Sequence, residues 1–435
     1  MAFVLFTLAA PLTGCDRSSG TQHDNGAFLI ASDPDATGYT RFSMNSGGNA
    51  LLVWRHWESG PESLRGVYYD ADAGWSDQAV INPGSTIANQ IAIGENNDCF
   101  AVWEDSAGIG TNRYDAQTGW GAATDIPRSG SGNAYNPTVA AGPQGTAFAL
   151  WSEYTSTTQS LWVSSYETGT GWSSSEPVQT LTNSGFGSYT IAVDGSGNAL
   201  AVWTQYVQYS GIYTVLARRY QVGVGWGQIE TIIAEDDTYP LNVAFDAAGN
   251  ALVVWGDIYN SSRRILSRRY SAGSGWEPIE TLLEVPVDTD YITEVHLAMN
   301  PAGDAVLVWM RPGSFGGYDI WADWYRAGSG WEKSPTRISD GTTDSQSPAA
   351  AIDPAGNAVV IWRGIYATKL NVGAARYSAG KGWSAPKIIS TDRDNVYTDF
   401  PGVGMDAQGS VLAVWQEYDT QNNILSFWGN RFDKF

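Results

Sequence analysis

The sequence predicts an all-β protein built from eight copies of one small unit, and three observations predict it. The composition combines 49 glycines and 20 tryptophans with only 16% charged residues, which suits short strands and tight turns better than helices. The string DAAGNALVVW, which ends at Trp255, recurs with small changes as DGSGNALAVW, NPAGDAVLVW and DPAGNAVVIW. The tryptophan that ends each copy recurs at intervals of 48 to 54 residues, at Trp54, Trp103, Trp151, Trp203, Trp255, Trp309, Trp362 and Trp415.

A second aromatic series is interlocked with the first. Seven further tryptophans each follow a glycine and stand six residues after a tyrosine, in the pairs Tyr69/Trp75, Tyr114/Trp120, Tyr166/Trp172, Tyr220/Trp226, Tyr270/Trp276, Tyr325/Trp331 and Tyr377/Trp383. Two series with a fixed internal spacing define one repeating unit rather than a scatter of aromatic residues.

Each unit is expected to contain four strands, which we call A to D. In the fifth unit these are NVAF (242–245), NALVVW (250–255), RILSRRY (264–270) and IETLL (279–283). The turn between strands A and B ends on a residue type that tolerates positive φ, which predicts a three-residue hairpin loop with a G1 bulge. These residues are Gly48, Asn97, Gly145, Gly197, Gly249, Gly303, Gly356 and Gly409.

The pattern within the strands indicates how the units pack. Strand B is apolar on both faces, so both faces of each unit must be buried. Strand A carries a small residue at one register, which lets innermost strands approach closely around an axis: Ser43, Ala92, Ala140, Ala192, Ala244, Ala298, Ala351 and Gly404. Four-stranded sheets that stack radially in this way are the blades of a β-propeller. We therefore predict one eight-bladed β-propeller over residues 26–435, with an open solenoid or two smaller propellers as the alternatives.

The two ends of the repeat predict how the ring closes. The last unit stops at NRFDKF, with Phe432 at the tyrosine register, so it lacks strand D. The segment AFLIASD before the first unit aligns with ETIIAED, the end of strand D in the fourth unit. We expect residues 27–31 to complete the last blade and to close the ring.

The N-terminal segment has features of an export signal. Residues 2–12 are apolar, and the string LTGC, which ends at Cys15, resembles the lipobox of bacterial lipoproteins, in which the cysteine is acylated. The resemblance implies a signal segment at 1–15, a flexible tether at 16–25, and an exported protein that a lipid anchors in the bacterial cell envelope. No basic side chain precedes Cys15, so either the true start lies upstream or the resemblance is accidental.

Charge and cysteine content bound the partners. The formal net charge is −21 and only five residues are lysines, which argues against nucleic acid as a partner. The second cysteine, Cys99, lies in the apolar run DCFAVW and is expected to be a buried thiol. We expect a monomer whose contact with the membrane is the lipid anchor.

The connections between strands divide into two sets. The sequences of the A–B and C–D turns are nearly the same in all units. The B–C and D–A connections vary in length and sequence, from EDSAGIGTN to MRPGSFGGYD among the B–C segments. In a propeller the two sets emerge on opposite faces, which we call the turn face and the loop face. Because variation on a fixed scaffold marks where function is usually carried, we place the candidate ligand site on the loop face.

The loop face is expected to be rich in aromatic and polar side chains, a combination that suits sugars. The candidate ligand-binding residues are Arg41, His56, Trp57, Glu153, Tyr154, Tyr206, Asp257, His296, Arg311, Arg363, Glu417 and Tyr418. Two of them, Arg41 and His296, stand two residues before the small residue of strand A, where they could line the mouth of the central channel. The alternative for each residue is a solvated loop position or packing between blades.

Metal and cofactor sites have little support in the sequence. A site with three histidine ligands is excluded, because the three histidines are His23, His56 and His296 and the first lies in the tether. We predict no metal and no cofactor. Calcium is the alternative, at the acidic pairs Asp236–Asp237, Asp288/Asp290 and Asp392/Asp394, which lack an EF-hand loop.

Catalytic motifs are also missing. No G-x-S-x-G, H-E-x-x-H or Walker string occurs in the chain. A pair of carboxylates for glycoside hydrolysis could come from Glu153, Asp257 or Glu417, provided that the fold brings two of them together.

Over about residues 26–435 the repeat resembles bacterial propellers of the sialidase-like and lectin-like groups. Sialidases carry an Asp-box, S-x-D-x-G-x-x-W, before strand D, whereas this chain has SAGSGW, DAQTGW or ETGTGW there. The resemblance also implies three arginines around the axis, for which Arg41, Arg311 and Arg363 are the candidates. The missing Asp-box counts against sialidase activity.

Three functions remain open at this point. We favour a membrane-anchored binding module of the cell envelope that recognises a glycan or a protein partner on the loop face. A polysaccharide-active enzyme, either a hydrolase or a lyase, would use the same face. A scaffold of an envelope complex is a third possibility.

Overall fold

The computed structural model describes residues 26–432 except 58, 183, 208–211, 237, 288–291, 314–315, 342–343, 367–368 and 392–395. Several sequence-based expectations fall outside the described residues: Cys15 with the lipobox and the tether, Asp237, and the pairs Asp288/Asp290 and Asp392/Asp394. Within the described part of the chain, no helix is long and apolar enough to cross a membrane.

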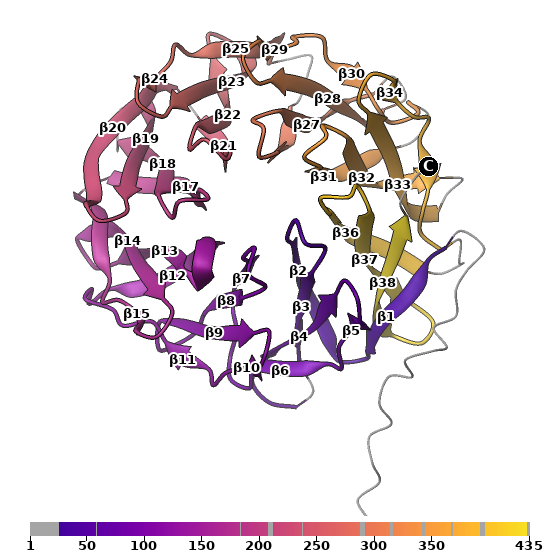
Figure 1. Cartoon of the computed structure of the whole chain (residues 1–435), viewed down its shortest axis with the longest axis horizontal. Coiled ribbons are helices and arrows are strands. Elements are labelled where there is room, and N and C mark those ends of the chain that lie inside the picture. Colours follow the sequence, from indigo (N-terminus) through magenta and orange to yellow (C-terminus); the bar gives the residue numbers. More distant parts are fainter. Residues whose placement is uncertain are drawn as a thin grey trace, which may run out of the picture.

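Eight antiparallel blades form a ring around a central axis (Figure 1), as the repeat predicts. The innermost strand of each blade is strand A: β2 (Ala36–Met44), β7 (Asn89–Ile93), β12 (Asn133–Ala141), β17 (Ser184–Val193), β21 (Thr238–Phe245), β26 (Thr293–Met299), β31 (Ser345–Ile352) and β36 (Val396–Met405). Strand B pairs with it: β3 (Ala50–His56), β8 (Cys99–Glu104), β13 (Ala147–Tyr154), β18 (Ala199–Val207), β22 (Ala251–Tyr259), β27 (Ala305–Pro312), β32 (Ala358–Tyr366) and β37 (Val411–Asp419).

Strand C lies on the other side of strand B in every blade. These strands are β4 (Ser63–Asp70), β9 (Ile109–Asp115), β14 (Thr158–Glu167), β19 (Ile212–Gln221), β23 (Ser262–Ser271), β28 (Tyr318–Arg326), β33 (Lys369–Ser378) and β38 (Ile424–Phe432). A single short 3-10 turn, Pro143–Gly145, is the one helical element that the described residues contain.

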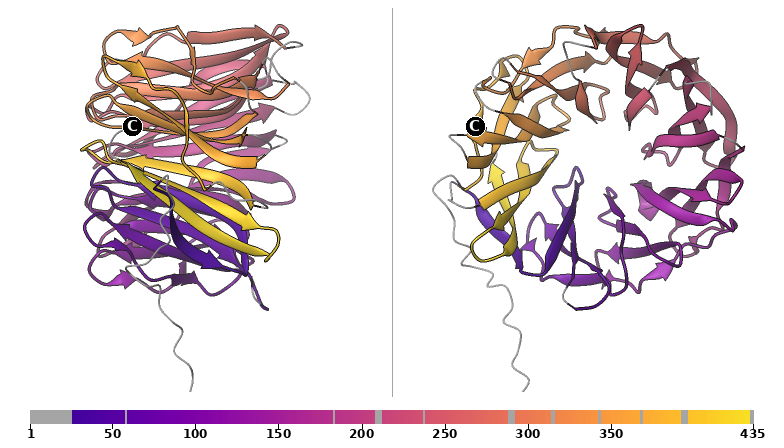
Figure 2. Two further views of the ribbon diagram at one scale, coloured as in Figure 1. Left: turned by 90° about the vertical axis from the view of Figure 1, so that its right-hand side faces the viewer. Right: turned by 180° about the vertical axis from the view of Figure 1, so that it is seen from behind.

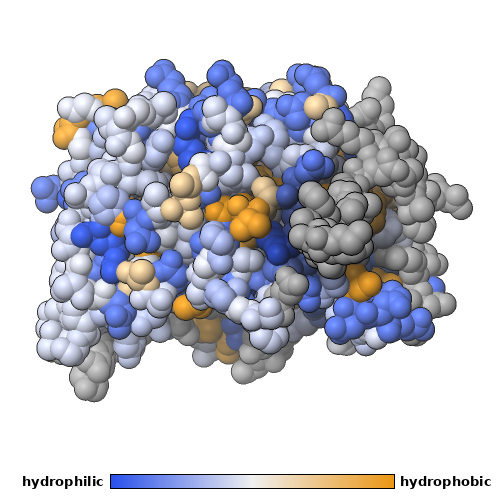
Figure 3. Space-filling model, turned by 90° about the horizontal axis from the view of Figure 1, so that it is seen from below, coloured by the Kyte–Doolittle hydropathy of each residue, from blue (hydrophilic) through white to orange (hydrophobic). Residues whose placement is uncertain are grey.

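The outermost strand D differs from the sequence-based expectation of one continuous strand. It is continuous in the fourth blade, as β20 (Gly225–Asp236). In six blades it is split into two pieces: β5 (Gly74–Trp75) and β6 (Ala79–Asn82), β10 (Gly119–Trp120) and β11 (Thr124–Asp125), β15 (Gly171–Trp172) and β16 (Glu176–Thr182), β24 (Gly275–Trp276) and β25 (Glu280–Pro286), β29 (Gly330–Trp331) and β30 (Thr336–Arg337), β34 (Gly382–Trp383) and β35 (Lys387–Ile388). Short, interrupted edges discourage pairing with other chains. The side of the ring seen in Figure 3 is mostly white and blue, with a small hydrophobic patch near its centre.

The ring closes through the N-terminal strand, as predicted. β1 (Phe28–Asp33) pairs antiparallel with β38, with Phe28 opposite Gly429 and Asp33 opposite Leu425. Figures 1 and 2 show this indigo strand beside the yellow end of the chain. The last blade therefore combines β36, β37 and β38 with β1, so that its four strands come from both ends of the propeller.

The A–B turns have the predicted left-handed residue. All eight residues expected at that position have positive φ, from 69° at Asn97 to 91° at Gly303. In the fifth blade, the carboxylate of Asp246 accepts hydrogen bonds from the amides of Ala248 and Asn250, both at 2.9 Å, so the first residue of the turn fixes its shape.

The eight motif tryptophans form the core between blades. Each is at most 2% exposed, and each belongs to a hydrophobic cluster that two successive blades share. Trp255 of the fifth blade, for example, packs with Leu200 and Val202 of the fourth. The repeated string DAAGNALVVW therefore belongs to the scaffold, because its tryptophan packs between blades.

In the eighth blade, strand A needs residues without a side chain because it lies very close to strand A of the first blade. A Cβ atom at Gly402 would lie 2.8 Å from the Cβ of Phe42 in the first blade, and one at Gly404 would collide with the side chain of Met44. Such a distance is too short for two carbon atoms, so β36 can pack against Phe42 and Met44 of β2 because Gly402 and Gly404 have no Cβ atom.

The second aromatic series has an inter-blade role that its spacing did not reveal. Tyr270 lies opposite Trp276 across the C–D hairpin, with ring centroids 5.4 Å apart. An arginine beside this tyrosine, Arg269, donates a hydrogen bond of 2.7 Å to the hydroxyl of Tyr325 in the next blade. The same contact closes the ring, because Arg431 donates to the hydroxyl of Tyr69 at 2.6 Å.

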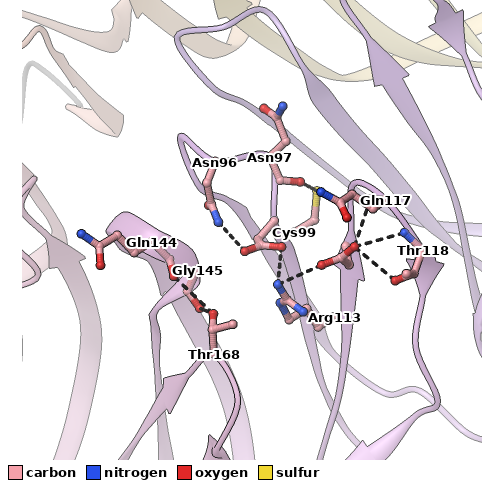
Figure 4. A network of polar contacts seen from close by, with 11 residues as sticks. Asn96, Asn97, Cys99, Arg113, Gln117, Thr118, Gln144, Gly145 and Thr168 are labelled. Carbon is pink, nitrogen blue, oxygen red and sulfur yellow. Dashed lines mark hydrogen bonds and ion pairs between the residues drawn. The ribbon is translucent and has the colours of Figure 1, made fainter.

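Polar contacts on the turn face also hold the turns of the second and third blades in place (Figure 4). In the third blade, the Thr168 hydroxyl donates to the carbonyl oxygens of Gln144 and Gly145, both at 3.2 Å. In the second blade, Arg113 pairs with Asp98 and Asp115, and backbone amides of Gln117 and then Thr118 lower the pKa of the Asp115 carboxyl. The turn face thus uses its polar groups to brace its own turns.

Cys99 is buried at the start of β8, as predicted, and burial with nearby Asp98 raises the pKa of its thiol. In a Cys15→Ser background, we expect Cys99 to be inert to an aromatic disulfide reagent at pH 8 while the protein is folded, because both access and thiolate are missing. Full reaction is expected in urea. Rapid reaction of the folded protein would show that this strand is not buried.

Candidate functional site

The structure gathers the predicted site residues into two pairs rather than into one site. Tyr154 and Tyr206 line a pocket of about 510 Å³ on the loop face between the third and fourth blades. Arg41 and His296 line a second pocket of about 410 Å³ among the inner strands. The remaining eight candidates line neither of these two pockets.

The first pocket, which we call the blade 3–4 pocket, is built by three connections. The turn from β13 to β14 supplies Tyr154 and the threonine-rich stretch 155–158, the start of β17 supplies Gly185, and the end of β18 supplies Tyr206. Tyr154 is exposed but held in place, because its ring packs edge-on against Tyr135 with centroids 5.4 Å apart. The pocket therefore presents a positioned aromatic ring to solvent.

Gln159 is the unusual residue of the blade 3–4 pocket. Its side chain is 7% exposed, and its Oε1 accepts a hydrogen bond of 3.0 Å from the amide of Phe186. Its Nε2 is buried and has no hydrogen-bond partner among the described residues. A buried amide nitrogen without an acceptor costs about 1–3 kcal/mol, so an acceptor supplied from outside would be favoured here.

The chemistry of the blade 3–4 pocket is polar but uncharged. Its described lining consists of the two tyrosines, Gln159, Gly185 and hydroxyl side chains at Thr155, Ser156, Thr157, Thr158, Thr182 and Ser184. The hydroxyls of Thr155 and Thr158 are already ordered, 2.8 Å apart. Such a lining can offer aromatic faces, hydroxyls and amide donors to a ligand, and it offers no ion pair.

The second pocket, which we call the axial pocket, carries charge. Arg41 of β2 and His296 of β26 belong to the first and sixth blades, and Glu294 and Phe400 line the pocket with them. Burial lowers the pKa of the Arg41 guanidinium. His296 is exposed on the inner side of the ring, yet the protein around its imidazole desolvates the charged form and lowers its pKa as well.

The three candidate carboxylates lie in different blades and have structural partners. Glu153 accepts from Trp151 at 3.1 Å and pairs with Arg128 at 3.2 Å. Glu417 accepts from the indole of the motif tryptophan in its own blade at 2.9 Å, and Asp257 is paired with Arg264 in a bidentate geometry. Since they belong to the third, eighth and fifth blades, they do not form the pair that glycoside hydrolysis requires.

His56 belongs to a buried polar cluster at ring closure. Its Nδ1 lies 2.8 Å from the carboxylate of Asp33, which also accepts from the indole of Trp54 at 2.8 Å. Among the described residues, Asp33, Asp35 and His56 offer ligand atoms within 4.8 Å of one another. Hydrogen bonds within the cluster already account for this arrangement.

The other candidates are spread over the loop face. Trp57 is 55% exposed, and Tyr418 donates a hydrogen bond to Asn423 of its own hairpin. Arg363 pairs with Asp399 at 3.3 Å, and Arg311 lies 5.4 Å from the ring centroid of Trp321. Of the three arginines suggested by the sialidase resemblance, only Arg41 lines the axial pocket.

Sequence reasoning missed Gln159, Glu294 and Phe400. No residue pattern reports that an amide in the polar string STTQS is buried, because its burial comes from the neighbouring blade. Glu294 and Phe400 share a position four residues before the small residue of strand A, with positive φ in both. The sequence offered one indication: residues of different types occupy this position in the aligned units.

Comparison with known proteins supports the fold and nothing finer. No family model matches the sequence, and no curated protein matches it either. Among solved structures, the chain is similar to the polysaccharide lyase Uly1, with 10% identity and a TM-score of 0.50, over 80% of this chain and 90% of that one.

Structures of a prolyl endopeptidase and of a puromycin hydrolase are similar at the same level. A prolyl endopeptidase has 15% identity and a TM-score of 0.50 over 90% of this chain, which spans 54% of that enzyme. The S511A mutant of a puromycin hydrolase, complexed with PGG, has 10% identity and a TM-score of 0.50 over 88% of this chain, which spans 59% of it. Identities this low establish a shared propeller architecture and do not transfer an activity.

Proposed function

We propose that the protein is a carbohydrate-binding propeller that takes a neutral glycan in the blade 3–4 pocket. The observation that carries this proposal is the unpartnered, buried Nε2 of Gln159 beside two tyrosines in an uncharged pocket. A sugar hydroxyl is an acceptor of the right size and polarity for that nitrogen. The C–H face of the same sugar ring can lie against Tyr154 or Tyr206.

The shape of the pocket favours a glycan over a folded protein partner. A stable protein interface usually buries about 1,200 Å² or more and has an apolar centre. The blade 3–4 pocket is instead a concave site of about 510 Å³ lined by hydroxyl, amide and phenol groups. The proposed lipid anchor at Cys15 stays a prediction, and with it the placement of the protein in the cell envelope.

Alanine substitutions at the two tyrosines test this function. We expect Tyr154→Ala and Tyr206→Ala each to weaken binding of the best neutral glycan from an array by roughly two- to tenfold, because each removes one stacking surface. Gln159→Leu is expected to weaken it by about tenfold, because it removes the buried donor. Isothermal titration calorimetry measures all three.

Tyr418→Ala is the matched control, since this tyrosine is similarly exposed on the loop face of the eighth blade. Its affinity should equal that of the unaltered protein. Equal losses in all the tyrosine variants, or an array without any neutral ligand, would contradict the proposal. New reducing ends after incubation with the glycan would instead favour the polysaccharide-active enzyme.

A further inference from the structure

The axial pocket is separate from the blade 3–4 pocket and has a different chemistry. Residues of the inner strands β2, β26, β31 and β36 line it, so it lies on the inner side of the first, sixth, seventh and eighth blades, which are neighbours in the ring. Figure 1 shows β2, β31 and β36 around the interior of the ring. None of its described lining residues belongs to the blade 3–4 pocket.

Arg41 is a half-buried cation without a counter-ion. Its Nη1 donates to the carbonyl oxygen of the preceding residue, Thr40, at 2.9 Å, and no described carboxylate lies within ion-pairing distance. Arg264, which is also half-buried, is paired with Asp257, whereas Arg218 and Arg268 donate to backbone carbonyl oxygens of other strands. Arg41 has only the carbonyl of its own neighbour among these contacts. A partly buried charge without a partner is costly, and an anion that enters the pocket would remove that cost.

The axial pocket also contains hydrogen-bonding groups and an aromatic ring, which suit a ligand that carries polar and apolar parts as well as a negative charge. Glu294 offers a carboxylate whose Oε2 accepts from the amide of Ser347 at 2.7 Å. His296 has a lowered pKa and is therefore neutral near pH 7, with one donor and one acceptor nitrogen. Phe400 is 46% exposed and presents an apolar ring at the same pocket.

Three residues of this pocket hold strained backbone conformations. Glu294, Ser347 and Phe400 have φ of 51°, 52° and 49°, at the same register of three successive inner strands. Tyr39 and Asn136 have the same conformation at this register, with φ of 53° each, although neither lines the pocket. The conformation is therefore a recurrent feature of the inner strands, and in this pocket it sets where the side chains project. Here the left-handed residue falls in the register shift of each inner strand, where strands A and B lose their regular pairing.

We propose that the axial pocket binds a carboxylate-bearing sugar, with Arg41 pairing the carboxylate and Glu294 and His296 accepting or donating hydrogen bonds at its hydroxyls. Phe400 provides the apolar surface for the ring of the sugar. A sugar acid joins the two features that the pocket requires, a negative charge for Arg41 and several hydroxyls for its neutral and anionic neighbours. This site does not depend on the neutral-glycan site of the proposed function.

Titration with D-glucuronate and D-glucose, followed by NMR at pH 7, tests the proposal. We expect D-glucuronate to bind at least about tenfold more tightly than D-glucose, and Arg41→Gln to weaken D-glucuronate binding by about ten- to a hundredfold. Arg41→Lys should keep part of the affinity, because it keeps the charge and loses the bidentate geometry.

Lys381→Gln is the control, because it removes one positive charge from the exposed turn face, far from the axial pocket. D-Glucuronate affinity should be unchanged in Lys381→Gln and in Tyr154→Ala, and urea unfolding should confirm that Arg41→Gln is folded. Equal binding of the two sugars, equal losses in the arginine and lysine variants, or no binding of D-glucuronate up to its solubility limit would overturn the proposal.

Discussion

The Ile30→Asp variant is expected to lose at least about 3 kcal/mol of unfolding free energy, because it places an unpaired carboxylate in the core that closes the ring. Ile30 of β1 is 7% exposed and packs with Leu425 and Phe427 of β38. The loss should be felt beyond one blade, since β1 holds the last blade together and the last blade contacts the first. Urea unfolding followed by tryptophan fluorescence measures it.

The neighbouring residue provides the control for this closure prediction. Leu29 lies on the same strand but is 37% exposed, so Leu29→Asp should change the unfolding free energy by only about 0.5 kcal/mol. If both variants were as stable as the unaltered protein, β1 would not complete the last blade and the ring would not close as described.

The Trp255→Ala variant is expected to lose about 3–5 kcal/mol, the usual cost of removing a large side chain from a packed core. Trp255 is fully buried between the fourth and fifth blades. Trp57→Ala removes the same side chain from the loop face, where it is 55% exposed, and should cost about 0.5 kcal/mol or less.

Thermal unfolding of the two tryptophan variants, followed by circular dichroism, separates the two roles. A large loss for Trp255→Ala and almost none for Trp57→Ala would assign the motif tryptophan to packing. Similar losses in both variants would contradict that assignment, because they would mean that exposure does not decide the contribution of a tryptophan here.

The repeat made the ring predictable because its constraints are local and occur eight times. A left-handed turn residue, a two-faced apolar strand and a small inner residue each leave a mark in the sequence, and Gly48, Trp54 and Ser43 show all three within one unit. Ring closure followed from a missing strand at one end and a spare strand at the other. The split of strand D was not predictable, because an exposed edge tolerates any polar residue.

The site was harder to predict because the same register serves two purposes. Glu153 and Glu417 stand two residues after a motif tryptophan and accept a hydrogen bond from its indole, as Asp105 does from Trp103 at 3.2 Å. In the sequence, acids that accept hydrogen bonds from buried indoles therefore occupy the same position as acids that would face a ligand on the loop face. Arg41 and Tyr154 do line pockets, and their neighbours there come from other blades, whose positions the repeat predicts. Whether either residue binds a ligand stays a prediction.

Hydrogen-exchange mass spectrometry with and without the best neutral glycan tests the central claim, that the ring binds sugar on its variable loop face. We expect slower exchange at residues 154–159 and at Tyr206, which line the blade 3–4 pocket, and unchanged exchange at the A–B turn 194–198 on the turn face. Protection confined to the turn face, or no protection at 154–159 while the glycan is bound, would contradict it.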